Sequence, residues 1–283
     1  MNPELVKIFE RSETVHVKDF ASRLFDCSEL TEENFVSVIL RASWVDISYL
    51  ENNNDTECKT IFHSEPKNAL NFFKQCTANQ TGCTIFAMGG ETFLKPVQNL
   101  ISQLDYLFYP RKFICGISIS NNNSKIPYHS DKADVFIIQI KGERIWTITD
   151  MNLLEKSVRH SIMKGQKRLV NESDFQDAQV HIINQLNTGD AMFIPALWPH
   201  TAQTIESRDA NQITLSISII SEILTPEIFL KRYGLRDKYI LADEFDERNN
   251  RNIELRSYSD FGIDRRVDKI LSDLIKEKII KSI

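Results

Sequence analysis

The spacing of hydrophobic residues changes along the chain, from helical spacing in the first third to short strand-like runs later. Residues 113–120 (FICGISIS) and 212–220 (QITLSISII) are apolar or alternate with small polar residues, which is typical of strands. Before them, hydrophobic residues spaced three or four positions apart predict an amphipathic helix: Phe93, Val97, Leu100, Ile101 and Leu104.

The first 110 residues predict mixed, mainly helical structure. Thr31, followed by two glutamates, is a suitable cap for one helix, and Pro66 fits the first turn of another. Residues 51–57 (ENNNDTE) are polar and predict a loop, whereas 84–88 predict a short strand that ends at Gly89-Gly90.

Many short strands without intervening helices favour a jelly roll, the double-stranded β-helix of the cupins. We therefore expect a mainly β fold with some α structure. The catalytic domain should span residues 1–221, with N-terminal mixed α/β support in 1–112 and the core in about 113–221. Residues 222–283 should form a C-terminal helical region, either a dimerisation element or a helix packed on the barrel, because apolar residues after 263 recur at helical spacing.

Turn residues suggest how neighbouring strands connect. Lys141-Gly142 predicts a tight turn, with residues 145–148 returning as the hairpin partner of 135–140. Residues 180–185 and 190–195 are expected to pair across Asn187-Thr188-Gly189. The charged stretch 151–180 carries few periodic signals and is expected to frame the mouth of a site.

Composition excludes some classes of protein. The 283 residues are 42% hydrophobic and 26% charged, which is ordinary for a globular protein, and the net charge of −5 does not favour a general phosphate-backbone binder. No leader and no membrane-length apolar run are visible, so we expect a cytoplasmic protein without membrane contact. The five cysteines form no C-x-x-C pair and are expected to be free thiols.

Candidate chemistry begins at His129-Ser130-Asp131. Alternation in a strand places His129 and Asp131 on one face, and they match two ligands of the 2-His-1-carboxylate triad of non-haem iron(II) oxygenases. His200 is the candidate third ligand, 69 positions after Asp131 (200 − 131 = 69). Arg144 lies at the start of the following predicted strand, where a cation can bind a carboxylate. The simpler alternative for the H-x-D triplet is a surface histidine beside a solvated carboxylate.

Two blocks of sequence resemble the JmjC/cupin-type 2-oxoglutarate oxygenases, and within them the bacterial and nuclear ribosomal-protein hydroxylases. The first block comprises residues 134–139 (DVFIIQ) and 142–146 (GERIW), and the second runs from Gly189 to His200. The resemblance covers roughly 97–218. It implies iron(II) bound by His129, Asp131 and His200, with Arg144 on the far carboxylate of the cosubstrate 2-oxoglutarate and with O2 as oxidant.

Two further residues are cofactor-binding candidates. Tyr128 either faces the cosubstrate or packs in the core. Ser216, with Thr214 and Ser218, lies on the polar face of a strand that lines either the cofactor cavity or solvent.

The substrate class stays open from sequence. The resemblance favours hydroxylation of an amino-acid side chain in a protein or peptide. A small molecule, a peptide natural product or a modified tRNA base are alternatives, the last because 156–168 is locally basic. An inactive cupin that serves as a binding module is the alternative of another class. A winged-helix domain, usual in the ribosomal-protein hydroxylases, has no counterpart in 222–283.

Overall fold

The computed structural model describes residues 7–8, 13–24, 27–51, 58–131, 133–163, 169–171, 174–175, 181–205, 212–221, 226–241, 263–276 and 280–282. The chain divides into two compact units. The larger unit comprises Arg11–Ile101 and Ile114–Ile220, and it contains almost all of two antiparallel sheets. The smaller unit comprises Met1–Glu10, Ser102–Phe113 and Ser221–Ile283.

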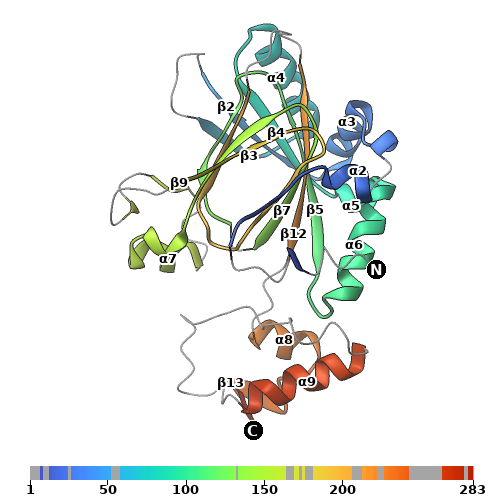
Figure 1. The fold of residues 1–283 in the computed structure, drawn as a ribbon, viewed down its shortest axis with the longest axis vertical. Helices are drawn as coiled ribbons and strands as arrows, with labels where there is room; N and C mark the ends of the chain where they lie inside the picture. The colour runs from blue at the N-terminus through green and yellow to red at the C-terminus, as the bar shows by residue number, and fades with distance from the viewer. Residues whose placement is uncertain are drawn as a thin grey trace. The chain divides into compact units, whose positions relative to one another are not determined.

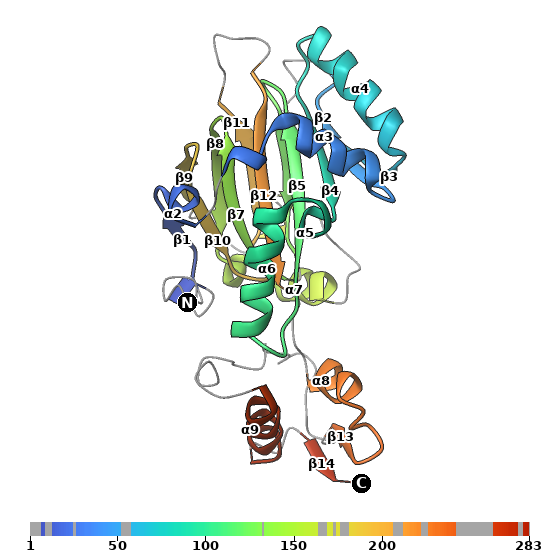
Figure 2. The same ribbon diagram turned by 90° about the vertical axis from the view of Figure 1, so that its right-hand side faces the viewer.

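The larger unit is built on one eight-stranded and one four-stranded sheet (Figures 1 and 2). The large sheet has the order β1 (Val15–Val17), β10 (Ala191–Ile194), β7 (Asp134–Lys141), β12 (Thr214–Ser221), β5 (Phe113–Ser120), β4 (Cys83–Met88), β2 (Val45–Tyr49), β3 (Lys59–Ser64). The small sheet has the order β6 (Lys125–His129), β11 (His200–Thr204), β8 (Arg144–Thr149), β9 (His181–Leu186).

Successive strands from β5 onward mostly alternate between the two sheets, which is the winding of a double-stranded β-helix and confirms the expected fold class. The two hairpins predicted from turn residues are wrong. β7 pairs with β10 in the large sheet, whereas β8 pairs with β11 and β9 in the small one. Likewise β9 pairs with β8, and β10 pairs with β7 and β1. The short turns therefore carry the chain from one sheet to the other.

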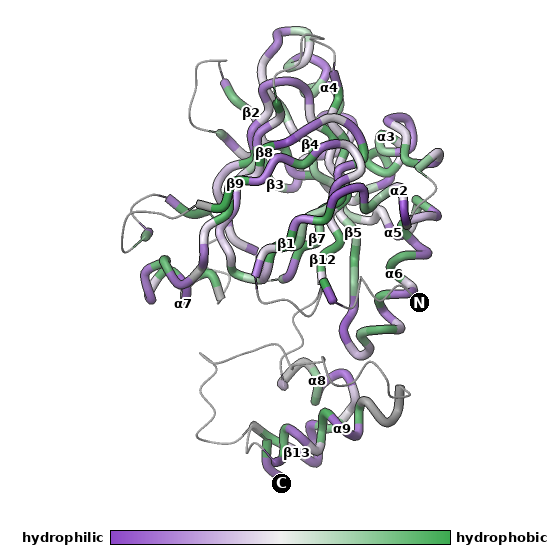
Figure 3. Tube along the Cα trace, viewed as in Figure 1, coloured by the Kyte–Doolittle hydropathy of each residue, from purple (hydrophilic) through white to green (hydrophobic). Residues whose placement is uncertain are grey.

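The hydrophobic core lies between the sheets, and β5 and β7 carry long hydrophobic stretches (Figure 3). One buried cluster joins Val135 and Ile137 of β7 to Trp146 and Ile148 of β8. Each such side chain contributes about 1.5–3 kcal/mol when it is fully buried. Because the cluster draws on both sheets, its packing fixes their separation and with it the space enclosed between them.

Helices α3 (Glu32–Arg41) and α4 (Pro66–Ala78) contact the large sheet, and both begin as predicted. The Thr31 hydroxyl accepts a hydrogen bond from the Asn34 N–H at 3.3 Å, and Pro66 occupies the first turn of α4. Further helical elements before β12 in the described part of the chain include α2 (Phe20–Leu24), η1 (Cys27–Glu29), α5 (Gly90–Phe93), α6 (Lys95–Leu107), η2 (Met151–Leu153) and α7 (Lys156–Met163). Most of the loop predicted at 51–57 lies outside the described residues.

The smaller unit contains α8 (Pro226–Arg232), β13 (Tyr239–Leu241), α9 (Ile263–Lys276) and β14 (Ile280–Ser282). Gly234, at φ +63°, follows the end of α8, where glycine readily adopts the left-handed conformation that ends a helix. The region also contains the β13–β14 pair, so it is not purely helical. The division at 221/222 stays a prediction. Within the described residues, no helix is long and apolar enough to cross a membrane.

Candidate metal centre and cosubstrate cavity

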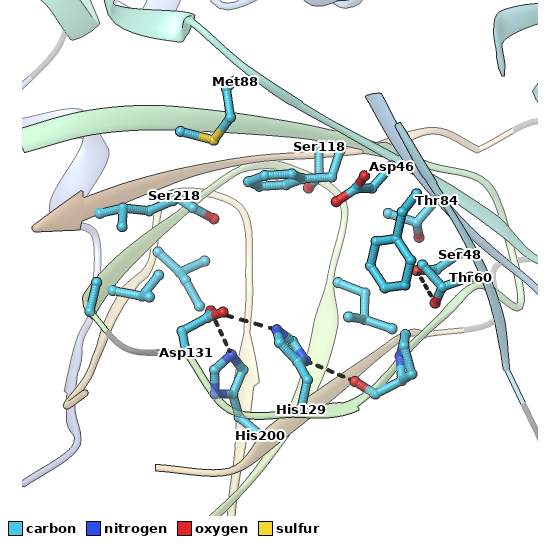
Figure 4. Close-up of a pocket in the computed structure, with 18 of the residues that line it drawn as sticks. Asp46, Ser48, Thr60, Thr84, Met88, Ser118, His129, Asp131, His200 and Ser218 are labelled. Carbon is cyan, nitrogen blue, oxygen red and sulfur yellow. Dashed lines mark hydrogen bonds and ion pairs between the residues drawn. The ribbon is translucent and has the colours of Figure 1, made fainter. Parts of the chain in front are cut away.

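The three candidate metal ligands converge at one end of the small sheet (Figure 4). His129 is the last residue of β6 and His200 the first of β11, and the pairing register places the two histidines directly opposite one another. Asp131 lies two residues beyond His129, just after the end of β6. The expectation that one strand carries both His129 and Asp131 is corrected accordingly, although both side chains reach the same point.

The ring orientations suit metal binding. The carboxylate Oδ2 of Asp131 lies 3.6 Å from Nε2 of His129 and 3.7 Å from Nε2 of His200. Each imidazole uses its other nitrogen on a backbone carbonyl, with His129 Nδ1 2.8 Å from the Pro127 oxygen and His200 Nδ1 2.9 Å from the Trp198 oxygen. Since a carbonyl only accepts hydrogen bonds, Nδ1 carries the proton in both rings, and both Nε2 lone pairs point to Asp131.

Backbone contacts hold the two ligand segments together. The Leu197 N–H donates to the Asp131 carbonyl at 2.7 Å, and the Ser130 hydroxyl donates to the Leu197 carbonyl at 2.7 Å. The Asp134 carboxylate accepts the Ala196 N–H at 2.8 Å, and Leu197 itself has φ +69°. A left-handed leucine costs free energy and persists where surrounding bonds enforce it. The geometry of the triad is therefore set by bonds between segments that are distant in sequence.

This donor set fits a divalent transition metal. Two imidazole lone pairs and a carboxylate, with ligand atoms within 4.8 Å of one another, concentrate negative potential at one point. A cation placed among these three ligand atoms is attracted to all of them. Two neutral imidazoles and one carboxylate on one side of an ion leave its remaining positions open, which suits iron(II) better than a closed structural zinc site.

The triad opens into a cavity of about 340 Å³ between the sheets. Arg144, the first residue of β8, lines the same cavity and is only 2% exposed. Its guanidinium donates to the Ser118 hydroxyl at 3.3 Å and also contacts the Ser120 hydroxyl. Among the residues that the structure describes, no carboxylate pairs with Arg144. The cavity thus has metal-binding side chains and a buried cation on its wall.

Burial lowers the pKa of Arg144 from its ordinary value to about 10. The side chain stays charged at neutral pH, since that pKa remains well above 7. A drop of this size corresponds to about 3 kcal/mol by which burial disfavours the charged form. An anion that bound the guanidinium would offset this cost.

The other two cofactor candidates do not line the cavity directly. Ser216 is buried and shares a hydrogen bond of 3.1 Å with Ser118, so it supports a residue that contacts Arg144. Tyr128 contacts the Thr149 hydroxyl and stacks on Phe175, in a small cluster formed with the insertion. The position of Tyr128 corresponds to the packing alternative and gives no support to a cosubstrate contact.

Sequence reasoning missed Ser118 and Ser120, which hold the Arg144 guanidinium. The signal was present in 113–120, where serines at alternate positions interrupt an otherwise apolar strand. Ser218, on the polar face singled out in 212–220, does line the cavity. Leu169 of the insertion also lines it, in keeping with the expectation that 151–180 frames the mouth, although much of that stretch lies outside the described residues.

Comparison with known proteins agrees with this architecture. Residues 100–223 match the family model of the JmjC domain. The fold is similar to that of YcfD, described as a ribosomal oxygenase from Escherichia coli. Its complex with cobalt and succinic acid gives a TM-score of 0.56 at 15% identity, over 98% of this chain and 68% of that chain. Its complex with cobalt and 2-oxoglutarate gives 0.53 at 16% identity, over 98% and 67%. None of the curated protein sequences matches the chain. The predicted JmjC-type fold is confirmed.

Proposed function

We propose that this chain, whose residues 100–223 match the JmjC domain, is an iron(II)- and 2-oxoglutarate-dependent oxygenase that hydroxylates an amino-acid side chain in a protein or peptide. One observation carries the proposal: the same cavity is lined by a three-ligand metal centre and by the buried Arg144. Among the described residues, no carboxylate pairs with this arginine. The similarity to YcfD, solved with cobalt and with 2-oxoglutarate, supports the same chemistry.

Each residue has a distinct task in this proposal. His129, Asp131 and His200 hold the metal through Nε2, a carboxylate oxygen and Nε2, and leave its other positions open. Arg144 binds the far carboxylate of 2-oxoglutarate, while Ser118 and Ser120 orient its guanidinium. When bound, iron(II) and 2-oxoglutarate supply the oxidising chemistry that transfers an oxygen atom from O2 to a C–H bond. The apolar cavity wall excludes water from that reaction.

The proposal is tested by iron binding and by turnover. Under anaerobic conditions the wild type should bind one equivalent of iron(II), and with O2 it should convert 2-oxoglutarate to succinate. His129→Ala, Asp131→Ala and His200→Ala should each lose both properties. His63→Ala, at an exposed histidine outside the triad, is the matched control. Full iron occupancy in the three triad variants would refute the metal assignment.

A protein or peptide substrate is favoured because YcfD is described as a ribosomal oxygenase. The net charge of −5 weighs against RNA, and a cytoplasmic location is part of the proposal. The enzyme is incubated with separate pools of peptides, small molecules and tRNA to distinguish these substrate classes. The pool that contains the substrate should stimulate succinate formation and should gain one oxygen atom, as measured by mass spectrometry. An inactive binding module would bind neither iron nor 2-oxoglutarate.

A further inference from the structure

Three large apolar side chains that are strongly exposed line the cavity: Phe62 (45% exposed), Ile114 (44%) and Leu169 (42%). They come from β3, β5 and the insertion, so three separate elements contribute exposed apolar side chains to the cavity wall. We call these three residues the apolar collar. Single exposed apolar residues are common, but several around one opening mark a surface that another molecule covers.

The collar is anchored to the metal centre on one side. Leu169 forms an isolated β-bridge with His129, and the Val170 N–H donates to the Tyr128 carbonyl at 2.9 Å. A molecule that covers the collar is therefore held beside the triad. Phe62 lies on β3, the last strand of the large sheet. An extended segment that runs along β3 presents every second side chain to the face that carries Phe62.

The described residues that line the opening carry few charges. The described lining residues with acidic or basic side chains are Asp46, Asp131 and Arg144, together with the two ligand histidines. Arg144 is buried, so no exposed lysine or arginine lines this opening within the described residues. A phosphate backbone needs several such cations, whereas an apolar peptide segment needs none.

We infer that the apolar collar docks a polypeptide segment with hydrophobic residues on either side of the residue that enters the cavity. The inference rests on the proposed function in one respect, namely that the residue that enters the cavity is the one that is hydroxylated. Docking of the segment itself requires no turnover. The occupant is an extended peptide whose flanking side chains cover Phe62 on one side and Ile114 and Leu169 on the other.

Binding can be measured without chemistry, by saturation-transfer NMR under anaerobic conditions with iron(II) and 2-oxoglutarate present, and again with both omitted. The probe is a pool of acetyl-Ala-Leu-X-Leu-Ala-amide peptides, where X is any coded residue except cysteine. The control is a second pool in which serine replaces both leucines. Phe62→Ser and Ile114→Ser should each weaken binding of the leucine pool about three- to tenfold, because each removes part of a buried apolar contact.

Two controls share the exposure but not the position. Ile61 is next to Phe62 in the sequence, is 41% exposed and does not line the cavity, so Ile61→Ser is the first control. Ile183 of β9 is 68% exposed and does not line the cavity either, so Ile183→Ser is the second. Neither should alter binding. Circular dichroism and thermal unfolding check that all four variants are folded, and Phe62→Tyr, which keeps the ring, should bind as the wild type does.

Equal binding of the two pools, no binding of either, or equal losses in the Ile61 and Phe62 variants would overturn the inference. So would collar-dependent binding of a tRNA pool in place of the peptides. Retained peptide binding together with absent iron binding would leave the docking surface intact and reject only the oxygenase.

Discussion

Replacing Arg144 with methionine should stabilise the protein that lacks metal and cosubstrate, although it removes a residue that the proposed function requires. Burial disfavours the charged side chain by about 3 kcal/mol, as its pKa of about 10 indicates. Its two hydroxyl contacts return about 1 kcal/mol each. Methionine keeps most of the volume without the charge, so the net gain is about 1 kcal/mol.

The hydroxyls that lose Arg144 are not left without partners. Ser118 keeps its hydrogen bond of 3.1 Å to Ser216, and Ser120 keeps one of 2.7 Å to Thr84. The substitution therefore removes a desolvated charge without creating an unpaired donor or acceptor. Removing one partner of a buried ion pair lowers stability strongly, because the other charge is left buried and unpaired. Arg144→Met leaves no such charge, so we expect a gain in stability.

The assay compares urea unfolding of the wild type and Arg144→Met in the absence of metal and 2-oxoglutarate, with unfolding midpoints at constant slope. Calorimetric titration of 2-oxoglutarate into the iron-loaded proteins under anaerobic conditions follows. Affinity should fall roughly ten- to hundredfold, since a charge-assisted contact contributes about 1.5–3 kcal/mol. A concentration of 2-oxoglutarate that saturates the iron-loaded wild type should raise the unfolding midpoint of the wild type more than that of the variant. A variant less stable by 2 kcal/mol, or one with unchanged affinity, would refute the reasoning.

The pH dependence of this effect has a defined sign. The folded-state pKa of Arg144, about 10, is below the unfolded value, so folding releases a proton only in the pH window between these two pKa values. In that window the contribution of Arg144 to stability rises with pH. Below pH 9 the side chain is protonated in both states, and the difference in stability between wild type and Arg144→Met should stay constant. A difference that changes between pH 6 and 9 would assign the effect to another group.

Two further predictions concern other parts of the chain. Asp190 accepts the backbone N–H groups of Asp19 and Asn187, both at 3.0 Å, so Asp190→Ala should lower stability by about 2–4 kcal/mol in urea unfolding, and a loss below 0.5 kcal/mol would contradict this. Burial raises the pKa of Asp190, but these hydrogen bonds and His16 lower it, and the net effect is a lowered pKa. The ionised carboxylate therefore stabilises the fold fully above the ordinary pKa of aspartate, and this stabilisation is lost as the pH falls through the lowered pKa of the folded state. Deleting 263–283, which includes amphipathic α9, should yield a smaller species in light scattering if α9 pairs across a two-fold axis, and a full-length chain that is already monomeric at high concentration would exclude the dimer.

Sequence patterns predicted individual elements well where local chemistry decides the structure. The strand at 113–120 matches β5, and the capped starts at Thr31 and Pro66 match α3 and α4. The three ligand positions were visible because few residue types bind iron(II) and because the H-x-D triplet is local. The opposition of His129 and His200 was not visible, since the register between β6 and β11 depends on packing of the whole barrel.

The incorrect hairpins have one physical cause, which also explains how Arg144 reaches the cavity. A two-residue turn between apolar runs signals a reversal of direction but does not say whether the second strand stays in the same sheet. At Gly142 the backbone has φ +74°, and a Cβ there would lie 2.5 Å from the Thr214 hydroxyl of β12. The chain passes close against the large sheet at this glycine and then leaves it. Had 144–149 remained beside β7, Arg144 would lie in the large sheet with Ser118 and Ser120. By crossing, β8 brings the guanidinium from the small sheet to those serines, across the space that the proposed cosubstrate fills.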